Sequence, residues 1–158
     1  MKKFCVIILL TSFLSGVVMK NCDNYFINQL NSVCVINCYN DGKIRSIAKD
    51  DAGFDNIIDE LSEIFDGCKE MPAFGVSLHN DTVNALKYGV WIELLFDKVH
   101  IHNGMQYERL LINLIDGSYG FNIIRYYDGK YEGRCFYIDL NNQISTQDFK
   151  IREIGNLL

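Results

Sequence analysis

Proline and low-complexity sequence are almost absent from this chain. Its 158 residues contain a single proline, Pro72, and no repetitive or strongly biased run. Such a composition argues against a disordered linker or tail. With 49% hydrophobic and 22% charged residues, the chain has the make-up of an ordinary globular protein, and its length favours one domain.

Several motifs that signal a cofactor or a metal are also missing. The sequence has no P-loop, no G-x-G-x-x-G, no EF-hand loop and no C-x-x-C pair, which removes the usual signals for nucleotide, dinucleotide, calcium and structural zinc sites. We therefore expect no cofactor. The net charge is −5, without a basic stripe. Because nucleic-acid affinity depends on neutralising phosphates, we expect no nucleic-acid partner and favour a basic protein as partner.

The N-terminus has the layout of a secretory signal peptide. Lys2 and Lys3 precede an uncharged apolar run from Phe4 to Val18, which is too short for a comfortable transmembrane helix. We expect residues 1–18 to be a signal peptide and residues 19–158 to form a single domain that is secreted, periplasmic or on the cell surface. An uncleaved anchor is one alternative, and a cytoplasmic protein translated from Met19 is another.

Cysteine usage bears on the same question of compartment. Of six cysteines, Cys5 lies within the apolar run, and the five that remain are an odd number. In an oxidising compartment they would allow two disulfides and one free thiol. Cys34 and Cys38 are four residues apart on a predicted strand, so they share a face but stand too far apart to join easily.

An Asp-Gly pair predicts a tight hairpin near the start of the domain. The type I′ turn needs positive φ at both central residues, and Asp41-Gly42 meets that need. The predicted hairpin runs from Val33 to Ala48 and places Tyr39 opposite Ile44.

A second Asp-Gly pair, Asp128-Gly129, centres a longer predicted hairpin from Ser118 to Asp139. Gly120 and Gly133 lie inside its strands and suggest a bulge or a close backbone approach. The turn predicts four cross-strand pairs: Tyr127 with Lys130, Tyr126 with Tyr131, Ile123 with Arg134, and Phe121 with Phe136.

The clearest helix signal runs from Phe54 to Asp66. Apolar residues recur there at the spacing of one helical face, namely Phe54, Ile57, Ile58, Leu61, Ile64 and Phe65. The opposite face is acidic, carries Asp55, Asp59 and Glu63, and lacks a basic residue. Such a face is usually only solvated, but it also suits a cationic partner. We therefore take these three residues as candidate binding residues.

The second half of the chain favours strands. From Val90 onward, turn signals such as Asp97-Lys98 separate strand-like runs, the last from Ile144 to Ile151. Short loops between successive strands indicate an antiparallel meander. The predicted fold class is α+β, with a meander of about five to six strands in the C-terminal half. One amphipathic helix packs against it, and an N-terminal β-hairpin precedes both. A second short helix is predicted between Asn80 and Gly89.

Two groups of residues are candidates for a site on the predicted strands. Tyr126 and Tyr131 would face each other on the long hairpin and offer a surface for a ligand, although aromatic residues are also simply common in strands. His100 and His102 point the same way on one strand. With Glu108 across the next turn they could hold a metal ion, since zinc sites take three or four such ligands. The alternative is a pair of surface histidines.

Signals for nucleophilic catalysis are weaker. Ser77 and His79 are neighbours on a short predicted strand, without the glycine after the serine that a nucleophile elbow needs. Cys135 lies mid-strand among aromatic residues, where a thiol is usually buried and inert. The leading hypothesis is a small exported, non-catalytic binding domain, for example an acidic inhibitor- or immunity-like partner of a basic protein. The alternative is a small metal-assisted or cysteine-dependent hydrolase using His100, His102, Glu108 or Cys135.

Overall fold

The computed structural model describes residues 25–66, 68–71, 75–114 and 119–139. The expected signal peptide, Pro72 and the strand predicted from Ile144 to Ile151 lie outside these residues. The helices within the described ranges are α1 (Phe26–Leu30), α2 (Phe54–Phe65) and α3 (His79–Ala85). The strands there are β1 (Val33–Asn40), β2 (Lys43–Ala48), β3 (Lys69–Met71), β4 (Val76–Ser77), β5 (Val90–His102), β6 (Met105–Leu114), β7 (Gly120–Tyr126), β8 (Gly133–Arg134) and β9 (Phe136–Asp139).

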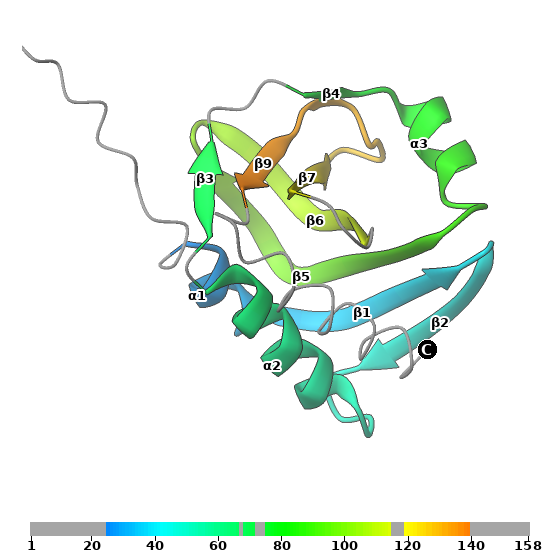
Figure 1. Ribbon diagram of the computed structural model, residues 1–158, viewed down its shortest axis with the longest axis vertical. Helices are drawn as coiled ribbons and strands as arrows, with labels where there is room; N and C mark the ends of the chain where they lie inside the picture. Colours follow the sequence, from blue (N-terminus) through cyan, green and yellow to red (C-terminus); the bar gives the residue numbers. More distant parts are fainter. Residues whose placement is uncertain (1–24, 67, 72–74, 115–118, 140–158) are drawn as a thin grey trace, which may run out of the picture.

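The main sheet has seven strands in the order β2-β1-β5-β6-β7-β9-β3, and β4 and β8 form a separate two-stranded sheet (Figure 1). Every strand pair is antiparallel. The predicted α+β class with an antiparallel sheet is therefore confirmed. The sheet is wider than the predicted meander, because β1 and β2 extend one edge and β3 extends the other.

One face of the main sheet carries the larger hydrophobic core. Helices α1 and α2 pack on this face (Figure 1). α2 begins at Phe54, after Gly53 with a φ of +96°, and ends at Phe65. The buried residues of α2 are Phe54, Ile57, Leu61, Ile64 and Phe65. Full burial of such a side chain contributes about 1.5–3 kcal/mol, so packing against the sheet is enough to hold this helix.

Three tight turns use an Asp or Asn followed by Gly, both with positive φ: Asp41-Gly42, Asn103-Gly104 and Asp128-Gly129. This is the conformation of the type I′ hairpin turn. Tyr39 lies opposite Ile44 in the first hairpin, and Tyr127 lies opposite Lys130 in the last. Local turn chemistry therefore sets the pairing beside each turn.

The turn predicted at Asp97-Lys98 is wrong. β5 continues through these residues to His102. The pairing of β5 with β6 jumps from Leu95–Arg109 to His100–Tyr107, so five steps along β5 match two along β6. The polar residues lie in an exposed bulge that interrupts the ladder without reversing the chain.

The predicted register of the long hairpin holds only beside its turn. Farther along, Ile123 pairs with Phe136 and Phe121 pairs with Ile138, which is two residues away from the predicted partners. The difference arises because the returning chain leaves β7 at Gly133, which has a φ of +101°. There it pairs with β4 as the short strand β8.

A smaller hydrophobic cluster lies on the opposite face of the sheet, where α3 and β4 cover it (Figure 1). It contains Tyr39, Leu86, Trp91, Leu111 and Tyr131. α3 begins at His79 without a side-chain cap. The second face is therefore only partly covered, and this is where the candidate site lies.

No disulfide joins Cys34, Cys38, Cys68 and Cys135 to one another within the described part of the chain. Cys34 donates a hydrogen bond to the Leu95 carbonyl at 3.3 Å, and Cys68 donates to the Ile64 carbonyl at 2.8 Å. Among the described helices, none is both long and apolar enough to span a membrane.

Candidate binding cleft

A buried carboxylate anchors the second face of the sheet. Glu93 lies in the middle of β5 and is fully buried. Its Oε2 atom accepts hydrogen bonds from Asn37 Nδ2 at 2.8 Å and from the Tyr39 hydroxyl at 3.0 Å. Its Oε1 atom accepts one from the Tyr131 hydroxyl at 2.5 Å and lies 3.6 Å from Arg109 Nη1. Burying a charge is costly unless it is paired and hydrogen-bonded, and here both oxygens are satisfied.

The surroundings of Glu93 shift the ionisation of its neighbours. Burial and then the nearby carboxylate raise the pKa of Tyr39 to about 12. The same two causes raise the pKa of Tyr131 above its ordinary value. Burial alone would lower the pKa of Arg109, but the charge of Glu93 and the adjacent tyrosines raise it overall. The tyrosines therefore remain protonated donors, and the guanidinium remains charged.

The Glu93 cluster also holds α3 in place. Tyr131 lies in the chain between β7 and β8 and reaches Glu93 with its hydroxyl. Its backbone N–H donates to His79 Nδ1 at 3.2 Å, and the two rings stack with centroids 6.0 Å apart. Since His79 is the first residue of α3, a single carboxylate fixes the start of this helix relative to the sheet.

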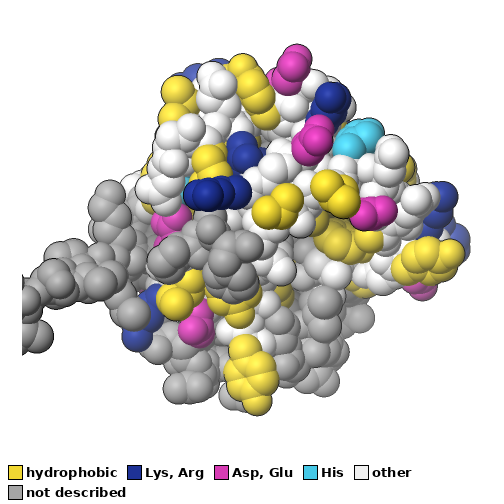
Figure 2. Space-filling model, turned by 90° about the horizontal axis from the view of Figure 1, so that it is seen from above, with side chains coloured by type: hydrophobic (Ala, Val, Ile, Leu, Met, Phe, Trp, Pro, Cys, Tyr) yellow, Lys and Arg dark blue, Asp and Glu magenta, His cyan; other side chains and the backbone are white. Residues whose placement is uncertain are grey.

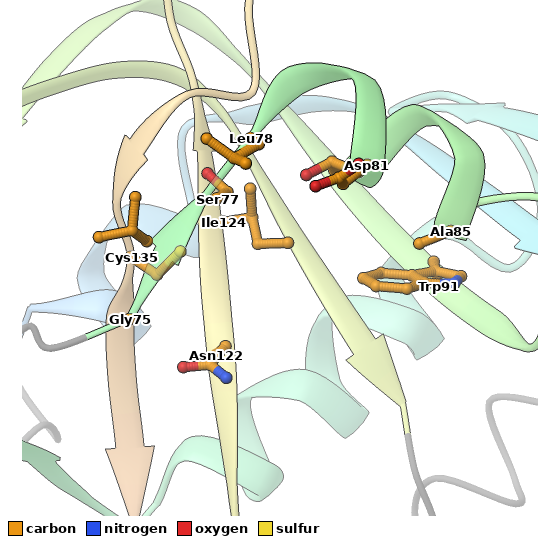
Figure 3. Close-up of a pocket in the computed structure, with 11 residues that line it drawn as sticks. Gly75, Ser77, Leu78, Asp81, Ala85, Trp91, Asn122, Ile124 and Cys135 are labelled. Atoms are coloured by element: carbon orange, nitrogen blue, oxygen red, sulfur yellow. The ribbon is translucent and has the colours of Figure 1, made fainter.

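A cleft of about 320 Å³ opens beside α3 and β4. Figure 3 shows Trp91 and Ile124 on the sheet side, with Asp81 and Ala85 on α3. The remaining lining residues are Gly75, Val76, Ser77, Leu78, Thr82, Asn122 and Cys135. Its size is at the lower end of the range for small-ligand sites, and its mixture of apolar side chains with a few polar groups is typical of them.

The position of β4 above the sheet depends on Gly75. A Cβ atom at this residue would lie 3.1 Å from Asn122 Oδ1 and 3.7 Å from the Cβ of Cys135. A side chain at this residue would make a tight contact with Asn122, so the glycine favours the close approach of β4 to the main sheet. The Cys135 N–H donates to the Gly75 carbonyl at 2.8 Å and secures this approach.

Apolar side chains are exposed around the cleft. Val76 is 67% exposed and Leu78 is 56% exposed, and both line it. Val83 and Tyr88 are exposed on α3 and just after it. The view onto α3 and β4 shows apolar side chains among polar and charged ones (Figure 2). Single exposed apolar residues are ordinary, but two at the mouth of a cleft favour a binding surface.

The nucleophilic side chains of the cleft have other partners. The Ser77 hydroxyl lies 3.3 Å from the Gly133 carbonyl, to which it donates. Burial raises the pKa of the Cys135 thiol, and hydrogen bonds from Ser77 offset only part of that effect. A thiol with a raised pKa stays protonated at neutral pH and is a poor nucleophile. His79 lies on α3, away from the strand face that the sequence suggested.

The structure brings the two predicted tyrosines together. The Tyr126 and Tyr131 rings meet edge to face with centroids 4.8 Å apart, and the Arg109 guanidinium lies 4.2 Å above the centre of the Tyr126 ring. Tyr131 is buried, while Tyr126 is half-buried. They form a packed part of the second face and support the cleft from beneath α3.

The predicted metal ligands are placed differently. His102 Nε2 lies 2.8 Å from both carboxylate oxygens of Glu70, and the His102 ring stacks on Tyr25. His100 Nε2 is 3.4 Å from the Ser32 hydroxyl. Within the described ranges, no three His, Cys, Asp or Glu side chains are placed to hold a metal ion, so Glu108 does not join the two histidines.

The acidic face of α2 has the predicted exposure. Asp55, Asp59 and Glu63 all lie on the solvent side of the helix, on the other side of the sheet from the cleft. Their role in binding stays a prediction.

The sequence did not point to Glu93 or to the cleft. The available signal was a lone acidic residue within the apolar run VWIELLF, which requires buried partners if that run is a central strand.

Comparisons with protein-family models, with curated proteins and with solved structures find no match for this chain.

Proposed function

We propose that this protein is a non-catalytic binding domain whose ligand occupies the cleft beside α3 and β4. The observation that carries the proposal is the cleft itself. An indole and a branched aliphatic side chain form its floor, and exposed Val76 and Leu78 stand at its mouth. Apolar surface in this arrangement gains free energy when a ligand removes it from water.

The chemistry of the lining favours binding over catalysis. The cleft has a protonated thiol at Cys135 and a hydroxyl at Ser77 that donates to a backbone carbonyl. Hydrolysis by a cysteine or serine needs an activated nucleophile with a base beside it. The histidine nearest to Ser77 in the sequence is His79, and its Nδ1 atom accepts a hydrogen bond from the Tyr131 N–H. A ligand would therefore meet apolar contacts, neutral hydrogen-bonding groups and the Asp81 carboxylate.

The test uses Trp91, the only tryptophan in the chain and a residue of the cleft floor. N-acetyl-leucine amide and N-acetyl-phenylalanine amide are the probes, because both join an apolar side chain to peptide groups and neither contains an indole. We expect each to change the Trp91 emission saturably, with a dissociation constant on the order of 1 mM for a ligand of this size.

A matched pair of variants on α3 separates the cleft from the rest of the surface. Ala85→Leu places a larger side chain in the cleft, whereas Asn84→Leu makes the same addition on the exposed side of the same helix. We expect Ala85→Leu to abolish the response and Asn84→Leu to preserve it. Equal responses from the two variants, or none from the native protein, would contradict the proposal.

A further inference from the structure

Among the described strands, β4 is paired on one side only. Its neighbour in the described part of the chain is β8, which pairs Val76 with Arg134 and Ser77 with Gly133. The Cys135 N–H donates to the Gly75 carbonyl one pair earlier. In an antiparallel ladder, hydrogen-bonded and non-hydrogen-bonded pairs alternate. Val76 and Arg134 therefore form the non-hydrogen-bonded pair, and the N–H and C=O of Val76 point away from β8.

The free side of β4 faces the cleft. Figure 3 shows β4 with the strand that carries Cys135 on one side and with Asp81, Ala85 and Trp91 on the other. Val76 and Leu78 both line the cleft. A donor and an acceptor from the Val76 backbone thus lie at the edge of a space whose floor is apolar.

Within the described residues, this edge is short but carries no charged side chain and no proline. Exposed edges are commonly blunted by charged side chains, by proline or by a covering element. The outward residues of β4 are instead Val76 and the following Leu78, both exposed and apolar. An apolar edge beside a hollow is the arrangement found where proteins bind an extended peptide as an added strand.

The charge of the cleft restricts the chemistry of the occupant further. Asp81 is the only carboxylate among its lining residues, and it is exposed at the start of α3. The chain as a whole carries a net charge of −5. A cationic side chain on the occupant would complement both.

We propose that the ligand is an extended segment of a partner polypeptide that adds a strand to β4. This inference rests on the proposed function and specifies its ligand. The segment exchanges backbone hydrogen bonds with Val76 and places an apolar side chain on Trp91 and Ile124. A lysine or arginine of the segment lies near Asp81. Side chains alternate along a strand, so main-chain pairing supplies affinity and every second side chain supplies specificity.

The experiment begins with a random 12-residue peptide library displayed on phage and selected on the full chain. Binders that the Ala85→Leu variant also retains are removed. Synthetic copies of the remaining peptides are titrated against Trp91 fluorescence. We expect them to share an apolar residue close to a basic one, and we expect Asp81→Asn to weaken binding about threefold, more at low salt than at high salt.

Backbone pairing is tested on the peptide and on the protein. N-methylation at successive peptide positions should weaken binding by about tenfold or more at the residue that pairs with Val76 and much less at the residues on either side of it, because their N–H groups point away from β4. On the protein, Val76→Pro removes the outward N–H without removing a bond to β8, and edge strands tolerate proline. We expect Val76→Pro to weaken binding about tenfold more than Val76→Thr, which alters the side chain but keeps the N–H.

The outcomes separate this inference from the proposed function. If the amide probes bind in the cleft but no peptide is selected, or if no single N-methylated position weakens binding more than its neighbours, strand addition is wrong and the binding function stands. A concentration-dependent dimer that Val76→Pro abolishes would identify a second copy of this chain as the occupant and would overturn a separate partner. If neither probes nor peptides alter Trp91 emission, both proposals fail. The N-methylation series uses the native protein, so it decides the question even if Val76→Pro does not fold.

Discussion

At the scale of single residues, Glu93 organises more of the second face than any apolar side chain there. It joins β1 through Asn37 and Tyr39, and it joins the β7–β8 connection through Tyr131. A leucine in its place would remove the acceptor of the Asn37 amide and of two tyrosine hydroxyls, and the charged partner of Arg109. The specificity of this face therefore comes from polar groups that must all be satisfied together.

We predict that Glu93→Gln destabilises the fold by about 2–4 kcal/mol. The amide keeps the shape of the carboxylate, but its NH₂ group must face donors, and Arg109 loses its charged partner. Urea denaturation gives the free energy of unfolding. Glu132→Gln is the control, because the Glu132 side chain is 57% exposed, and we expect a change below about 0.5 kcal/mol. A similar loss for both variants would show that Glu93 has no special role.

The same scale shows why a short sequence pattern misleads. His100 and His102 share a strand, which the alternation of side chains made predictable. The partners that they use, Ser32 and Glu70, lie on other elements. Two residues on one strand predict which way their side chains point. They do not predict which distant residues those side chains will contact.

At the scale of elements, turn chemistry predicted the strand pairing next to each turn, but the predicted pairing became wrong farther along the strands. The Asx-Gly turns have the φ values that their composition requires. Phe121 nevertheless pairs with Ile138 and not with Phe136. The pairing changes because Gly133 directs β8 to β4, a strand that lies more than 50 residues earlier in the chain. A register predicted from the turn alone cannot take account of a distant strand that pairs with the same segment.

Gly120 offers a test of close packing between β7 and β9. A Cβ atom there would clash with the Ile138 carbonyl oxygen and lie 2.5 Å from the Tyr137 hydroxyl. The backbone must move to accept it, so we predict that Gly120→Ala costs about 2–4 kcal/mol of unfolding free energy.

The control for Gly120→Ala is Gly129→Asn. Gly129 has a positive φ and nothing within 4 Å of its Cβ position, and asparagine tolerates this conformation. We expect a cost below about 1 kcal/mol in thermal or urea denaturation. If Gly120→Ala is as mild as this control, β7 and β9 are not packed as closely as the structure indicates.

At the scale of the whole molecule, two layers on opposite faces share one sheet. The antiparallel α+β architecture was predictable from periodicity and turn spacing, and so was the helix at the larger core. The short helix predicted after Asn80 corresponds to α3, but the position of α3 and β4 on the second face was not predictable, because both elements are short and have weak periodicity. Their positions follow from Gly75, Tyr131 and Glu93, residues that come together only after the sheet has formed.

Both layers contain groups that set an alkaline limit on stability. Folding raises the pKa of Cys38 to about 11 and that of Tyr39 to about 12, mainly through burial. At neutral pH both states hold these protons, and the contribution to stability is fully present. Above about pH 9 the unfolded chain begins to lose protons that the folded chain retains. Stability therefore falls as the pH rises towards about 12.

The measurement is the urea midpoint between about pH 7 and pH 11. Tyr131→Phe removes one of the buried phenols, so its midpoint should fall less steeply above about pH 10. A midpoint that stays constant over this range, or an identical slope in the variant, would contradict the assignment of these groups to the interior.

The edge strand β3 has a consequence for how the chain reaches this structure. Lys69 pairs with Asp139, so β3 has no partner until about 70 further residues have been synthesised. The connection through α2 takes the chain from β2 at one edge of the sheet to β3 at the opposite edge. Contacts of this range form slowly, because loop closure must precede them. We therefore expect the chain on the ribosome to stay open, exposing its sheet-forming segments to chaperones, until β9 has emerged.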